Sequence, residues 1–110
     1  MNEREFRMRL EIDVTVLEVW VEQGWLVPDI KEEGRQFRDV DLARGRLILD
    51  LSDRMGLNEP GVDLVMGLLD QLHGVRSTLR DLTDAVCRQN PDVQMRILSD
   101  LDRLERQKRR

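Results

Sequence analysis

The sequence predicts a mainly α-helical protein with a small two-stranded hairpin and a long C-terminal coiled-coil helix. Aromatic residues make up only 4% of the 110 residues, and only three prolines occur, which disfavours an all-β sandwich. Apolar residues recur at spacings of three and four over most of the chain, as they do on one face of a helix. A polar stretch that ends at Gly34 interrupts this pattern, as a hairpin loop would.

The first elements are expected to be two short helices joined by a turn. Phe6 and Leu10 lie four residues apart, which places them on one edge of the first helix. A capping-box pattern, with Thr15 as the N-cap and Glu18 reaching back, predicts a second helix that stops at Gly24. The side chains that we expect in the core from this region are those of Leu17, Trp20, Val21 and Trp25.

A small wing and a third helix are expected next. Residues 25–27 and 36–38 are short apolar-containing segments on either side of a polar loop, which predicts two antiparallel strands. Asp39 or Asp41 is expected to cap the next helix, which should run to about Met55 because its apolar residues recur every three or four positions.

A long helix is expected over residues 58–89, and a last amphipathic helix over residues 90–110. Seven apolar residues of the long helix alternate spacings of three and four, which is typical of a coiled-coil seam. They are Val65, Leu68, Leu72, Val75, Leu79, Leu82 and Val86. A monomer would leave much of this seam in water, so we expect a homodimer through the long helix. The alternative is that residues 93–104 fold back and cover the seam. Gly67 and Gly74 lie on another face, where close helix packing or simple exposure would explain them.

The remaining counts exclude several classes of protein. One cysteine and one histidine leave no internal disulfide and no plausible zinc site. No apolar stretch approaches 18 residues, no glycine-rich phosphate loop follows a strand, and no nucleophile–base pair can be argued from spacing. We therefore expect a cytoplasmic protein that is not an enzyme, that carries no cofactor or metal, and that does not enter a membrane.

Acidic residues are concentrated in one short region. Residues 11–33 carry seven acidic side chains against Lys31 alone, a charge of −6, whereas the whole chain carries −4. A concentrated field of one sign steers a partner of the opposite sign, so this region predicts a face for a basic partner. A merely solvated acidic surface is the alternative. The candidate partner-binding residues are Glu11, Asp13, Glu18, Glu22 and Asp29.

The order of elements and two local patterns resemble the MerR-like winged helix-turn-helix. That family typically shows Thr-Leu-Arg-Tyr-Tyr-Glu-Arg-x-Gly-Leu-Leu-x-Pro, followed by Arg-x-Tyr-x-x-x-Asp-Leu. Leu17, Gly24, Leu26 and Pro28 fall in the first pattern, and residues 35–42 fit the second with phenylalanine in place of tyrosine. The chain is then expected to divide into a winged helix-turn-helix body over 1–57, a long helix with its coiled-coil seam over 58–89, and an amphipathic helix with a basic tail over 90–110.

The departures from that pattern argue against DNA as the ligand. Glu18 stands where the family has a phosphate-contacting arginine, and Glu22 stands at a later basic position. The second helix, residues 15–23, contains no lysine or arginine. Because protein–DNA affinity comes largely from cations that replace counterions at phosphates, such a helix would repel DNA.

Two stretches also resemble the chaperone-modulator family CbpM: residues 17–28, and residues 56–62 with 68–72. This resemblance implies a specific partner, the J-domain of a DnaJ-like (CbpA-type) co-chaperone, whose activity the modulator would inhibit. A J-domain engages Hsp70 through a basic helix, so an acidic face is a suitable competitor. Two other functions stay open: a MerR-like DNA-binding transcriptional regulator, and a coiled-coil adaptor for another partner.

Overall fold

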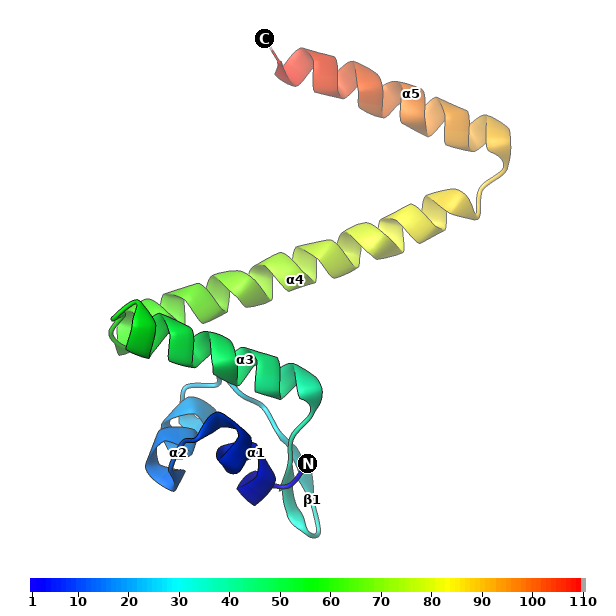
Figure 1. Ribbon diagram of the computed structural model, residues 1–110. Coiled ribbons are helices and arrows are strands. Elements are labelled where there is room, and N and C mark those ends of the chain that lie inside the picture. The colour runs from blue at the N-terminus through cyan, green and yellow to red at the C-terminus, as the bar shows by residue number, and fades with distance from the viewer. Residues whose placement is uncertain (110) are drawn as a thin grey trace. The chain divides into compact units, whose positions relative to one another are not determined.

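The computed structural model describes residues 1–109 and is mainly helical, as the sequence predicted (Figure 1). The chain divides into two compact units: unit 1, Met1–Leu68, and unit 2, which begins at Leu69. The elements of the chain are α1 (Glu3–Leu10), α2 (Val14–Glu22), β1 (Asp29–Lys31), β2 (Gly34–Gln36), α3 (Asp39–Leu49), the π-helical turn η1 (Asp50–Arg54), α4 (Glu59–Cys87) and α5 (Pro91–Lys108). This order confirms the expected winged helix-turn-helix with a long helix after it.

Helices α1 and α2 are joined by a tight turn, and the cap of α2 differs from the prediction. Glu11, at the C-cap of α1, has a left-handed backbone (φ 54°) that turns the chain. The N-cap of α2 is Asp13, whose carboxylate accepts a hydrogen bond from the Val16 backbone N–H at 2.9 Å. The expected Thr15 cap is therefore wrong, because the helix has already begun at Val14 and leaves Thr15 inside the first turn.

The two strands of the wing lie closer to the hairpin loop than the sequence predicted. Ile30 pairs with Arg35 and Lys31 with Gly34, so the strands are β1 and β2 rather than residues 25–27 and 36–38. Trp25 and Leu26 are buried instead, as is Phe37, because these apolar side chains reach the core of unit 1 and cannot line an exposed hairpin. The turn is completed by Gly34 at φ 112°, a conformation that favours glycine.

The N-cap of α3 lies before both predicted caps, one residue before Asp39 and three before Asp41. It is Arg38, whose backbone N–H donates to the Asp41 carboxylate at 2.9 Å. The predicted N-cap is therefore wrong, because Asp41 satisfies the helix start from inside the first turn. The helix continues into η1 and ends near Met55 as expected, before Gly56 at φ 72°.

The core lies entirely in unit 1. Phe6 and Phe37 stack with their ring centroids 4.2 Å apart, which joins α1 to the segment after the wing. Trp20 and Trp25 are both buried, as predicted. The buried apolar side chains are those of Phe6, Leu10, Leu17, Trp20, Trp25, Leu26, Phe37, Leu42, Ile48, Leu51, Val62 and Met66.

The part of α4 as far as Leu68 belongs to unit 1 and completes this core, and the rest of α4 belongs to unit 2. Val65 packs partly against the core, and Met66 is the last buried residue along the helix. Among the described residues of unit 2 none is buried, and Leu79 and Leu82 are 59% and 61% exposed. The alternative in which residues 93–104 cover the seam is therefore not the conformation of this chain. Over residues 1–109, no helix is long and apolar enough to cross a membrane.

Candidate interaction surface

The candidate surface is built on α2, the second helix of the helix-turn-helix. Leu17 and Trp20 are buried in the core, and Val16, Val19 and Val21 pack partly against it, which leaves Val14, Thr15 and Glu22 as the exposed positions of the helix. Glu22 is exposed and Glu18 is partly exposed, and the helix contains no basic residue. The exposed and partly exposed positions of α2 therefore carry valines, Thr15 and two glutamates, and no cation.

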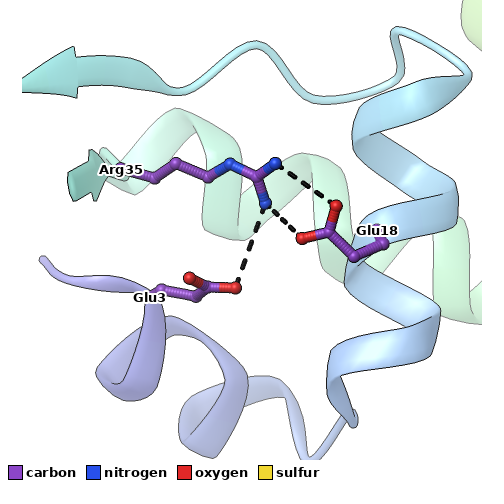
Figure 2. Close-up of polar contacts among 3 residues, drawn as sticks. All are labelled: Glu3, Glu18 and Arg35. Carbon is purple, nitrogen blue, oxygen red and sulfur yellow. Dashed lines mark hydrogen bonds and ion pairs between the residues drawn. The ribbon is translucent and has the colours of Figure 1, made fainter.

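An arginine of the wing meets this face. Figure 2 shows the Arg35 guanidinium, which extends from β2, between the carboxylates of Glu18 on α2 and Glu3 on α1. Arg35 donates through both terminal nitrogens: Nη1 to Glu18 Oε1, and Nη2 to Glu18 Oε2 at 3.3 Å. Nη1 also lies 3.9 Å from Glu3 Oε1. Such a two-pronged contact fixes geometry better than a lysine could, because the guanidinium is a planar fork.

The pKa values follow from this contact. The hydrogen bond from Arg35 lowers the pKa of the Glu18 carboxyl, against a smaller opposing effect of burial, and the positive charge of Arg35 adds to the lowering. The same hydrogen bond raises the pKa of Arg35. Glu18 is therefore held ionised, and its charge is compensated inside unit 1.

Comparison with known proteins identifies the family to which this helix-turn-helix belongs. The model of the MerR helix-turn-helix family of regulatory proteins matches residues 1–84. The chain belongs to the MerR family. No curated protein and no solved structure matches it significantly. In this MerR-family protein, the Arg35 guanidinium of the wing is directed at Glu18, a glutamate of the helix that follows the turn.

The other predicted partner-binding residues fall into two groups. Asp13 is exposed but already serves as the N-cap of α2. Glu11, Glu22 and Asp29 are exposed at the end of α1, at the end of α2 and at the start of β1. The three latter carboxylates are thus the accessible part of the predicted set.

Sequence reasoning missed the roles of Arg35 and Glu3. The signal was present only indirectly, because a hairpin packed beside a helix-turn-helix brings residues distant in sequence together. The exact strand register decides which wing residue reaches α2, and the expected strands were displaced.

Further contacts fix the turn after α2 to α4 within unit 1. The Trp25 indole Nε1 donates to Asp63 at 2.8 Å, and Gln23 Nε2 donates to Glu59 at 3.1 Å. Arg44 Nε donates to the Trp25 carbonyl at 2.8 Å. Polar contacts therefore fix the end of α2 and the turn after it to α3 and to the start of α4. Within residues 1–109, no group of three or more histidine, cysteine, aspartate or glutamate residues could hold a metal ion.

Proposed function

We propose that this MerR-family protein is a chaperone modulator of the CbpM type, which binds the J-domain of a DnaJ-like co-chaperone and inhibits it. The single observation that supports this function best is the absence of available cations on α2. The helix has no lysine or arginine, and Arg35 of the wing, which contacts the helix, is engaged by Glu18 and Glu3. A helix-turn-helix without cations on this helix lacks the main source of affinity for DNA.

The exposed carboxylates suit the opposite kind of partner. The carboxylates of Glu11, Glu22 and Asp29 are exposed. None of them caps α2 or pairs with Arg35. A J-domain presents a basic helix to Hsp70. The exposed carboxylates of this protein would compete with Hsp70 for that helix by charge complementarity. Inhibition then follows from competition: while the modulator occupies the basic helix, Hsp70 cannot, and J-domain-stimulated ATP hydrolysis falls. This function requires no catalytic residue and no cofactor, and it places the protein in the cytoplasm with its partner.

Calorimetry against the cognate J-domain tests the proposal. The informative variant is Glu22→Lys/Asp29→Lys, because both residues are exposed and neither belongs to the Arg35 contact. Exposed ion pairs are each worth about 0.2–1 kcal/mol, and reversal adds repulsion, so we expect roughly three- to thirtyfold weaker binding. Wild-type binding should also weaken as salt rises, because charges on the surface are screened over about 8 Å at physiological ionic strength.

A matched control separates a local effect from a change in net charge. Asp81→Lys/Asp84→Lys reverses two exposed carboxylates of α4 in unit 2 and alters the net charge by the same amount. We expect near wild-type affinity from this variant. Equal affinities of the wild type and both variants at low and high salt would show that the acidic face does not bind the J-domain.

The family assignment favours one alternative, a DNA-binding transcriptional regulator, because the matching family model describes regulatory helix-turn-helix proteins. A gel-shift assay with varied DNA sequences distinguishes the two functions. Salt-sensitive DNA binding at nanomolar protein, together with no binding to the J-domain, would favour the alternative.

A further inference from the structure

The two most exposed large apolar side chains of residues 1–109 lie three residues apart, at the wing of unit 1. Val27, in the segment between α2 and β1, is 72% exposed, and Ile30, in the middle of β1, is 77% exposed. An isolated exposed apolar residue needs no explanation. Neighbouring ones form the kind of apolar patch that marks an interaction site. We refer to Val27 and Ile30 as the wing pair.

The strand that carries Ile30 is the open edge of the wing. On its other side β2 is covered, because Asn2 forms a β-bridge with Gln36 and the Phe37 backbone N–H donates to the Met1 carbonyl at 2.8 Å. Within the described part of the chain, β1 pairs only with β2. All three residues of β1 are exposed, whereas two of the three in β2 are partly buried. A partner can therefore reach the wing along β1.

The register of the hairpin places Ile30 beside the Arg35 contact. Ile30 pairs with Arg35, so the two side chains leave the same face of the wing as neighbours. From this face Arg35 extends to Glu18 on α2 (Figure 2). Glu22 follows Glu18 by four residues, on the same side of α2 and one turn nearer its C-terminal end. In Figure 2 the chain leaves that end of α2 and reaches β1 above the Arg35–Glu18 contact, so Glu22 and the wing pair lie on the same side of it.

The surroundings of the wing pair are acidic. Between residues 27 and 34 the acidic side chains are Asp29, Glu32 and Glu33, and all three are exposed. Lys31 is the only basic residue in this stretch, so its charge is −3 + 1 = −2. An apolar centre with a charged rim is the usual anatomy of a protein–protein interface. The sign of this rim calls for a positively charged partner.

We propose that the wing pair is the apolar centre of the surface that binds the J-domain. Val27 and Ile30 pack against apolar side chains of its basic helix, while the acidic residues around them meet its cations. This inference rests on the proposed function and adds to it the side chains that supply most of the affinity. Exposed ion pairs are individually weak and mainly steer association, whereas apolar side chains buried at the centre of an interface contribute in proportion to their area. The surface then selects an amphipathic basic helix over a merely basic one.

Calorimetry of full-length Val27→Ala/Ile30→Ala against the cognate J-domain tests the inference. We expect at least about tenfold weaker binding, because apolar area is removed from the centre of the contact. The fold-loss should be the same at low and high salt, since salt screens charges and not apolar contacts. The fold-loss caused by Glu22→Lys/Asp29→Lys should instead shrink as salt rises. This difference separates an apolar centre from a further contribution of charge.

A matched control tests whether the position of the apolar side chains matters. Met8 and Met55 are 67% and 68% exposed and lie on α1 and after η1. Met8→Ala/Met55→Ala therefore removes equally exposed apolar side chains elsewhere in unit 1, and should bind within about twofold of the wild type. The near-ultraviolet circular dichroism of the buried Trp20 and Trp25 checks that unit 1 is folded in every variant.

The contrary results distinguish this inference from the proposed function. A wild type that binds the J-domain, beside a Val27→Ala/Ile30→Ala variant that loses no more affinity than the control, would overturn the inference and leave the proposed function standing. A wild type that does not bind the J-domain would overturn both. A variant that keeps its affinity for the J-domain but self-associates more weakly in light scattering would assign the wing pair to a second copy of the chain, and would also overturn the inference.

Discussion

Arg35 is the residue on which the character of the α2 face depends. By pairing with Glu18 and Glu3 it joins the wing to both helices of the helix-turn-helix (Figure 2). It also removes from the surface a cation that a DNA-binding protein would direct at phosphate. Loss of either partner would leave the other charge partly buried and uncompensated.

The pH dependence of folding should report this contact. The pKa of Glu18 is lower in the folded protein than its ordinary value, so its contribution to stability is fully present above about pH 4.3 and is lost as pH falls through the folded pKa. We expect Glu18→Gln to lower the urea midpoint at pH 7 and to have a progressively smaller effect as the pH falls through the folded pKa of Glu18. Chemical denaturation of both proteins across this range is the measurement. Glu22→Gln, on the same helix, is the control, and an unchanged gap between wild type and Glu18→Gln at all pH values would contradict the assignment.

The accessible carboxylates could be predicted from the sequence, but their separate roles could not. Charge counting along the chain found Glu11, Glu22 and Asp29, because solvated side chains follow local patterns. It could not find that Asp13 caps a helix or that Glu18 is paired, since each role depends on a backbone position set by its neighbours.

Among the elements, α2 shows how an error of two residues in the predicted helix start changes which residue is identified as the N-cap. The capping-box pattern predicted the N-cap at Thr15, but the tight turn after Glu11 starts the helix two residues earlier, with Asp13 as its N-cap. The same effect displaced the wing, where burial of Trp25 and Phe37 took precedence over strand propensity. The π-helical turn of η1 has no signal in the sequence pattern.

The cap of α2 can be tested directly. Asp13→Ala removes the acceptor for the Val16 backbone N–H and should destabilise unit 1 by about 0.5–2 kcal/mol. Thr15→Ala, within the first turn, should change stability by no more than about 0.5 kcal/mol. Thermal unfolding of the two variants compares them under identical conditions. A larger loss from Thr15→Ala than from Asp13→Ala would restore the cap that the sequence suggested.

The glycines of α4 provide a second test at this scale. A Cβ built at Gly67 or Gly74 meets no atom within 4 Å, so neither glycine is required for packing within the chain. Gly74→Ala should stabilise the helix by up to about 1 kcal/mol, through helix propensity alone. Circular dichroism on heating should show a higher midpoint, and light scattering should show unchanged dimerisation. Weaker dimerisation would instead mean that another helix packs closely against this glycine.

In the molecule as a whole, stability is divided unequally between the two units. All twelve buried apolar residues belong to unit 1, whereas no described residue of unit 2 is buried. The sequence indicated this division, because the apolar stripe of α4 is wide near Val62 and narrow beyond Leu72. A wide stripe packs into a core, and a narrow seam packs on one neighbour. The buried core that stabilises the described chain therefore lies in unit 1, and unit 2 leaves its apolar seam exposed.

Amide hydrogen exchange should resolve this division. Leu79→Lys should accelerate exchange along α5 and the α4 seam, because helices without a buried face open with little free energy. Protection in α1, α2 and α3 should match that of the wild type, since their core contains no residue beyond Met66. Ser77→Lys is the matched control: it places the same charge on the exposed face of α4 away from the seam, and should leave exchange in both units unchanged. Accelerated exchange in α1–α3 of the Leu79→Lys protein would show that unit 1 depends on unit 2 for its own stability.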